Sequence, residues 1–138
     1  MIAYLDSSVL LRVVLRQPNA LKEWRSIKQG VASRLVEVEC LRTLDRIRST
    51  VEVEDKIIAT RREAIFRLLE TLEVVEPTGV VLSRASQPLP TVLGTLDAIH
   101  LSTAMLWRER TGTDMVMATH DEALGVAAKA SGLRVVGI

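Results

Sequence analysis

Four acidic residues occupy positions from which carboxylates could form a metal site. Asp6 follows a short apolar run at the start of the chain, and Asp121 follows another apolar run near its end. Glu39 lies early in one helical pattern, and Asp97 opens a later one. Two carboxylates about 4 Å apart repel by roughly 4 kcal/mol at an effective dielectric near 20, so a cluster of these four indicates a cation. Taken alone, Asp6 is equally explained as a turn residue.

The composition favours a cation that binds oxygen. The chain has two histidines, His100 and His120, and a single cysteine, Cys40, so it lacks a set of soft ligands at zinc-binding spacing. Mg²⁺ prefers carboxylate oxygens and retains bound waters, and such a site activates a water for attack on a phosphodiester. The acids therefore indicate metal-dependent phosphodiester hydrolysis. His100 is interpreted first as a packed side chain, with a role beside Asp97 as the alternative.

Helix capping offers a different explanation for two of the acids. Thr119 with Glu122 matches a capping box, and Asp121 would then simply suit the positive end of the helix. Thr95 and Asp97 stand at the start of a predicted helix in the same way. For these residues the sequence leaves both interpretations open.

Periodicity leaves Glu37 and Glu39 as competing candidates in one predicted helix. At 100° per residue, Glu39 shares a polar face with Arg42 and Arg46, whereas Glu37 falls beside Leu41. Glu39 and Arg42 could also form an ordinary surface ion pair. The pattern indicates only that the two acids face different ways.

Short apolar runs of strand length alternate with helical patterns along the chain. The expected strands lie at 2–5, 31–33, 73–75, 114–118 and 134–136. The expected helices lie at 8–16, 20–29, 34–48, 54–71, 80–86, 96–110 and 121–131. Ser7 or Ser8 is expected to cap the first helix, and Gly30 to end the second. The alternation predicts a parallel sheet with helices on both faces, and ligands bind at the carboxyl ends of such strands.

Length and composition limit the remaining possibilities. The 138 residues fit one domain, 1–138, and no apolar run is long enough to predict a membrane span or resembles a signal peptide. Cys40 is expected to be buried and cannot form an internal disulfide, which favours a cytoplasmic location. The net charge of +1 gives no overall basic field for nucleic acid, although residues 42–67 are rich in Arg. An aromatic content of 3% argues against a module that stacks bases.

Four stretches of the chain resemble the PIN-domain toxins called VapC in their order and spacing: YLDSSVLLRVV, SRLVEVECLRTL, TLDAIHLSTA and MATHDEALGVAAKASGL. The resemblance spans nearly the whole chain, and TLDAIHLSTA is its most specific part. It implies a three-layer α/β/α fold with a four- or five-stranded parallel sheet. It also implies an endoribonuclease that depends on Mg²⁺ or Mn²⁺, cleaves RNA, forms a homodimer and is inhibited by a cognate VapB-type antitoxin.

The resemblance also assigns roles to individual residues. The family's acids, carried over by motif, are Asp6, Glu39, Asp97 and Asp121. Asp6, Asp97 and Asp121 would hold the metal. Glu39, which the resemblance selects over Glu37, would position the metal or the attacking water. Ser7 and Thr119 would support the metal or its waters. One departure is Gly94, where many relatives carry Arg or another polar residue before the Ser/Thr-Leu-Asp motif.

Two other function classes compete with a nuclease. A catalytically silent binding module could dock a partner peptide against the Arg-rich helices, as amphipathic helices dock in grooves. A receiver-type phosphoacceptor domain would need an acid pair near the first strand and a Lys after a later strand. The first strand offers only Asp6, and no Lys follows residues 114–118, which disfavours this class.

Overall fold

Five parallel strands form the centre of the computed structural model, which describes residues 1–138. The strands are β1 (Ile2–Leu5), β2 (Gln29–Ser33), β3 (Glu73–Val75), β4 (Val116–Ala118) and β5 (Arg134–Val136). Their order across the sheet is β3-β2-β1-β4-β5, and every neighbouring pair is parallel. The parallel arrangement predicted from the sequence is therefore confirmed.

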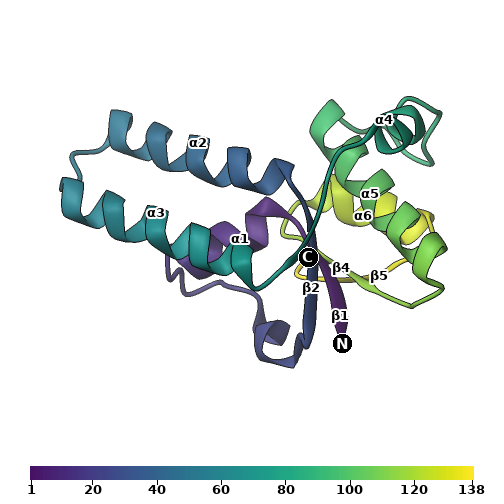
Figure 1. Cartoon of the computed structure of the whole chain (residues 1–138), viewed down its shortest axis with the longest axis horizontal. Coiled ribbons are helices and arrows are strands. Elements are labelled where there is room, and N and C mark those ends of the chain that lie inside the picture. The colour runs from purple at the N-terminus through teal and green to yellow at the C-terminus, as the bar shows by residue number, and fades with distance from the viewer.

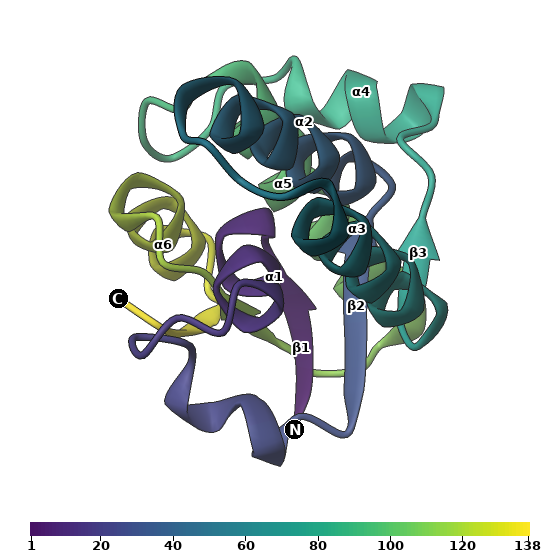
Figure 2. The ribbon, with the colours of Figure 1, turned by 90° about the vertical axis from the view of Figure 1, so that its left-hand side faces the viewer.

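Helices cover both faces of this sheet (Figure 1). The α-helices are α1 (Ser7–Val14), α2 (Leu35–Thr50), α3 (Asp55–Glu70), α4 (Gly79–Ala85), α5 (Thr95–Thr111) and α6 (Glu122–Ala130). Figure 2 shows α1 and α3 in front of β1 and β2, with the α2–α3 hairpin on the same side. Helices α5 and α6 cover the opposite face, and α4 packs on α5. The architecture is the three-layer α/β/α fold, with five strands.

Alternation along the central strand divides the core in two. Ala3 and Leu5 of β1 belong to the cluster packed under α1, α2 and α3. Tyr4, which points to the other face, packs with residues of α5 and α6. All three side chains have no exposed surface, so β1 is buried on both faces, as expected of the middle strand of a parallel sheet.

The chain order creates a switch point between β1 and β4. From β1 the chain moves outward through β2 to β3, then returns to β4 on the other side of β1 and continues to β5. Connections that leave in opposite directions open a crevice at the carboxyl ends of the two strands, where ligands bind in open α/β sheets. None of the helices combines the length and apolar character needed to cross a membrane.

The helix predicted at 20–29 is wrong. Only a short 3₁₀ helix, η1 (Lys22–Ser26), forms there, and Gly30 lies inside β2 rather than after a helix. β2 pairs with β1 on one side and β3 on the other, so main-chain hydrogen bonds and burial outweigh the local helical pattern. The other predicted strands and helices form, with no end shifted by more than two residues.

Gly30 generates a test of this packing. A Cβ at this position would lie 2.6 Å from Leu72 Cδ2 and 2.8 Å from Leu5 Cδ1. Gly30→Val is expected to lower the free energy of unfolding by about 1–3 kcal/mol, because overpacking displaces core side chains. Gly79→Ala is the control, since a Cβ added there would meet nothing within 4 Å. Urea denaturation of both variants is the measurement, and an unchanged Gly30→Val would contradict this packing.

Candidate metal centre

Asp6 lies at the point where β1, α1 and β4 meet. Its backbone N–H donates to the carbonyl of Ala118, which ends β4. The residue is 4% exposed, and its Oδ2 accepts hydrogen bonds from Ser8 Oγ at 2.6 Å and from Thr119 Oγ1 at 2.9 Å. Its other oxygen, Oδ1, has no hydrogen-bond donor and lies 3.9 Å from His100 Nε2. One carboxylate oxygen is thus held in place, and the other is left for a ligand.

The two hydroxyls also hold the turn that follows β4. Ser8 Oγ accepts from the backbone N–H of His120 at 3.0 Å, and Thr119 Oγ1 accepts from that of Asp121 at 2.9 Å. Each hydroxyl therefore links a backbone amide to the Asp6 carboxylate. Ser8 was not predicted as part of the site. Its position two residues after Asp6 was the available signal, but the sequence did not show which hydroxyl faces the acid.

Glu39 reaches the same place from the first turns of α2. Its Oε1 lies 2.6 Å from His100 Nε2, and its Oε2 accepts a hydrogen bond from Ser7 Oγ at 3.3 Å. The predicted alternative, an ion pair with Arg42, does not form, because Arg42 pairs with Asp45. Glu37 makes no side-chain hydrogen bond or ion pair with the partners of Glu39, which are His100 and Ser7.

His100 is a component of the cluster, although the sequence favoured a packed side chain first. The ring is fully buried, and its Nδ1 lies 2.8 Å from the Tyr4 hydroxyl. Burial lowers the pKa of His100, but the hydrogen bond and charge of Glu39, with the charges of Asp6 and Asp97, raise it overall. Because an ionised carboxylate can only accept, Nε2–H donates to Glu39, and the Tyr4 hydroxyl lies at the opposite side of the ring.

Asp6, Glu39 and His100 form the tightest group of possible metal ligands. One ligand atom from each lies within 4.8 Å of the others. Both nitrogens of His100 are already engaged by Glu39 and Tyr4, so the imidazole is better placed to orient Glu39 than to bind an ion. The carboxylates are the groups with acceptor positions remaining, and they fit a hard, oxygen-binding cation.

Asp97 joins this cluster electrostatically from the first turn of α5. Its pKa is raised above the ordinary value because the carboxyl is partly buried and because Asp121, Asp6 and Glu39 are negative, while His100 acts in the opposite sense. The residue before α5 that serves as its cap is Gly94, with no side-chain capping bond. Neither Thr95 nor Asp97 acts as the predicted cap, although Asp97 does lie in the first turn of α5, where a negative charge suits the positive end of the helix.

Asp121 has a structural role at the start of α6, where the sequence predicted that its charge would suit the positive end of the helix. It is itself the N-cap of α6, and its Oδ1 accepts from the backbone N–H of Leu124 at 2.9 Å. The predicted capping box of Thr119 and Glu122 is therefore wrong by two residues, because the Thr119 hydroxyl serves Asp6 instead. The cap predicted for α1 is also wrong: Asp6 occupies that position without a side-chain capping bond.

Cys40 follows Glu39 but does not contribute a ligand. It is 1% exposed, as predicted for a small core residue. Burial, with the nearby charges of Glu39 and Asp6, raises the pKa of its thiol to about 12. The thiol therefore stays protonated, which leaves oxygen as the donor type of the site.

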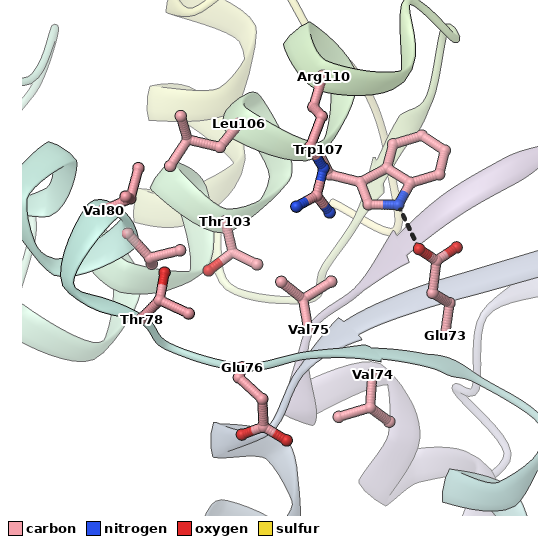
Figure 3. Close-up of a pocket in the computed structure, with 11 residues that line it drawn as sticks. Glu73, Val74, Val75, Glu76, Thr78, Val80, Thr103, Leu106, Trp107 and Arg110 are labelled. Carbon is pink, nitrogen blue, oxygen red and sulfur yellow. Dashed lines mark hydrogen bonds between the residues drawn. The ribbon is translucent and has the colours of Figure 1, made fainter.

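A separate recess of about 490 Å³ lies along the β3 edge of the sheet (Figure 3). It is bordered by β3, α4 and α5, and the indole N–H of Trp107 donates to Glu73 at 2.9 Å across one end. Its lining contains none of the acids of the metal cluster. The volume of this recess therefore does not mark the position of the acidic cluster.

Comparisons with known proteins agree on one family. The family model described as "PIN domain" matches residues 3–130. Ribonuclease VapC46 of Mycobacterium tuberculosis (strain ATCC 25618 / H37Rv) is 35% identical, with 96% of this chain and 95% of that protein covered.

Two solved structures share the fold at low sequence identity. A toxin-antitoxin complex from Klebsiella pneumoniae has a TM-score of 0.67 at 16% identity and covers 99% of this chain and 96% of its own. The structure of FitAB bound to an IR36 DNA fragment has a TM-score of 0.67 at 13% identity, with 98% and 93% covered.

Asp97→Asn tests the electrostatic cost of the cluster. A carboxyl whose folded-state pKa is raised contributes stability below its unfolded pKa and loses it as pH rises through the folded value. At pH 7 in EDTA, Asp97→Asn is therefore expected not to lower the free energy of unfolding, and to raise it by up to about 1 kcal/mol after solvent screening. This gain should shrink as pH falls toward 4.

The matched control is Asp55→Asn, which removes another first-turn acid from a helix, here α3. It should lose a few tenths of a kcal/mol through the helix dipole at pH 7. A loss of more than about 2 kcal/mol in Asp97→Asn would instead show that Asp97 stabilises the start of α5.

Thr119→Val tests the hydroxyl that joins Asp6 to the turn after β4. The variant removes one of the two hydroxyl donors to the buried Asp6 carboxylate, and it also takes away the acceptor of the Asp121 N–H. We expect a loss of about 1–3 kcal/mol, the range for an unsatisfied buried group. Thr119→Ser keeps the hydroxyl and should retain most of the stability in the same urea titration. Equal stability of Thr119→Val and wild type would contradict this role.

Proposed function

The chain belongs to the PIN-domain family, and on that basis we propose that it is a VapC-type endoribonuclease toxin, a single domain over residues 1–138. The observation that carries the proposal is the group of carboxylates at the switch point between β1 and β4, where Asp6 and Glu39 share His100. The 35% identity to a ribonuclease over nearly the full length of both chains supports RNA phosphodiesters as the bonds cleaved.

The proposed cofactor is Mg²⁺ or Mn²⁺. Asp6, Asp97 and Asp121 would hold it, directly or through water, because each has a carboxylate oxygen without a hydrogen-bond donor. The pKa of Asp97 is raised, first by its partial burial and then by the negative charges of Asp121, Asp6 and Glu39, which a cation bound here would offset. When bound, such an ion activates a water for attack on the phosphodiester and stabilises the leaving oxygen.

The residues around the acids prepare the site for this reaction. Ser8 and Thr119 fix the Asp6 carboxylate in one orientation, so that little rearrangement is needed when the substrate arrives. His100 and Ser7 hold Glu39 from two sides. Glu39 would position the metal or the attacking water. In this scheme Ser7 and Thr119 act on the carboxylates, and through them on the ion.

The proposed substrate is RNA that approaches along α2. Thr43 and Arg46 follow Glu39 by one and two helical turns on one face, and Arg46 Nη2 donates to Thr43 Oγ1 at 2.9 Å. This bond turns the guanidinium back toward the acidic end of the helix. A cation there offsets the repulsion between the RNA backbone and the carboxylates. Arg42, Arg48 and Arg67 are engaged in ion pairs instead.

The proposed partners are a VapB-type antitoxin and a second copy of the chain, in the cytoplasm. A structure with the same fold is described as a toxin-antitoxin complex. The α2–α3 hairpin exposes apolar side chains, among them Val38, Ile57 and Phe66, at 56, 45 and 41%. An amphipathic segment of a partner could cover such residues, as helices do in apolar grooves.

A pair of acids on one helix gives the sharpest test of the activity. Purified protein is incubated with a mixed RNA pool and Mg²⁺ or Mn²⁺, with EDTA as the metal-free control. Glu39→Gln is expected to lower the cleavage rate by about 100-fold or more, the scale of a lost transition-state contact, whereas Glu37→Gln should stay within about twofold of wild type. Asp6→Asn should be inactive.

Two results would contradict the proposal. Cleavage that persists in EDTA would exclude the metal mechanism, and cleavage that persists in Asp6→Asn would exclude this site. Complete absence of cleavage with every metal would favour a catalytically silent binding module.

A further inference from the structure

Tyr4 is a buried polar residue next to the candidate metal centre and has no role in the reaction proposed so far. It is the only tyrosine of the chain and has no exposed surface. Tyr4 and Asp6 stand two positions apart in extended chain, so both side chains leave β1 on the same side of the sheet. On this side α5 brings His100 over both of them, with Nδ1 2.8 Å from the Tyr4 hydroxyl and Nε2 3.9 Å from Asp6 Oδ1.

The position of Glu39 depends more on His100 than on its other partner. Its Oε1 lies 2.6 Å from His100 Nε2, whereas the bond from Ser7 Oγ to Oε2 is 3.3 Å long. Hydrogen bonds weaken as the two heavy atoms move apart. The Glu39 side chain is 20% exposed, so a carboxylate that is not held can turn toward solvent. The imidazole is therefore the stronger of its two anchors.

The imidazole itself has one bonding partner at each ring nitrogen. Nε2 meets Glu39 and Nδ1 meets Tyr4, while the 3.9 Å separation from Asp6 is too long for a hydrogen bond. Rotation of the ring by half a turn about its Cβ–Cγ bond would put carbon atoms in the places of the nitrogens. With both partners present this rotation breaks two hydrogen bonds, and without the Tyr4 hydroxyl it breaks only one.

A hydroxyl suits Nδ1 because it can both donate and accept. It donates to the bare nitrogen of a neutral ring and accepts from the N–H of a charged one, so His100 keeps this partner in both forms. Burial raises the pKa of Tyr4, so the hydroxyl stays protonated. Phenylalanine at this position would fill nearly the same space and leave Nδ1 unpaired in a fully buried place, which is unfavourable.

We propose that Tyr4 is a positioning residue for RNA cleavage, which acts through His100 to keep the Glu39 carboxylate directed at the metal centre. The inference rests on the ribonuclease function proposed above. The contacts run from β1 through α5 to α2, so a core side chain sets the geometry of an acid at the site. Partners that orient the ligands of metal sites typically contribute about 10–100-fold to affinity or activity.

The kinetic test compares Tyr4→Phe with wild type on one single-stranded RNA in Mg²⁺ or Mn²⁺. We expect kcat to fall about tenfold or more and KM to stay within about twofold, because the hydroxyl orients Glu39 and does not bind RNA. Ser102→Ala is the control. It removes another buried hydroxyl of α5, one without a hydrogen-bond partner, and should keep kcat within about twofold of wild type.

A double-mutant cycle with His100→Gln tests whether Tyr4 acts through the imidazole. The glutamine amide can donate to Glu39 but has no ring whose orientation Tyr4 could hold. In that background Tyr4→Phe should change kcat by less than about twofold, since the two effects are not independent. An equal loss in both backgrounds would overturn the proposal, because Tyr4 would then act by another route.

Nuclear magnetic resonance of ¹⁵N-labelled histidine gives a readout that needs no cleavage. In EDTA the Nε2 proton of wild-type His100 should exchange slowly with water, because it is buried and bonded to Glu39. In Tyr4→Phe this exchange should become about tenfold faster as the ring loosens. His120, whose ring bonds the Gly137 carbonyl instead, is the internal reference and should stay unchanged. Circular dichroism verifies that each variant is folded.

The two readouts separate this inference from the proposed function. Faster exchange in Tyr4→Phe, without cleavage by any of the proteins, would support the positioning contact and reject the ribonuclease. Cleavage by Tyr4→Phe at the wild-type kcat, or exchange as slow as in wild type, would overturn the role of Tyr4. An equal loss of kcat in Ser102→Ala would also overturn it, because the loss of any buried hydroxyl nearby would then have the same effect.

Discussion

The site depends on how one buried carboxylate is satisfied. Asp6 ends the central strand, and its Oδ2 accepts hydrogen bonds from a hydroxyl of α1 and from Thr119 after β4. The same hydroxyls accept from the backbone amides of His120 and Asp121. A buried charge is tolerated only when it is paired or hydrogen-bonded, so these bonds hold together two segments, residues 6–8 and 119–121, that are distant in the sequence. The position of Asp121 follows from this junction, through its N–H bond to Thr119.

The remaining carboxylates keep the charge of the site high. His100 offsets only part of it. Its Nε2 serves Glu39, and the pKa of Asp97 stays raised, first by partial burial and then by the charges of the other acids. Stability is therefore given up at the place where a cation would be bound. This is the usual relation between a functional site and the fold that supports it: the local rules are broken where chemistry is done and obeyed elsewhere.

Most of the fold was predictable because local patterns of apolar and polar residues indicate its strands and helices. Short apolar runs indicated all five strands, and the alternation with helices indicated the parallel sheet. The exception was the helix expected at 20–29. There the chain forms η1 and then β2, whose Gly30 lets Leu5 and Leu72 approach closely. That contact involves residues far apart in the chain, and no local pattern contains it.

The sequence by itself determined the acids and the edge of the sheet at which Asp6 and Asp121 stand, since parallel strands end together. It could not decide between capping and metal binding, because one spacing serves both. The tertiary structure shows which of the acids is a cap: Asp121 caps α6 through one carboxylate oxygen, and Asp97 makes no side-chain capping bond. It also brought His100 to Glu39 across 61 positions of sequence. Such contacts are set by helix packing over the sheet, which composition and periodicity do not encode.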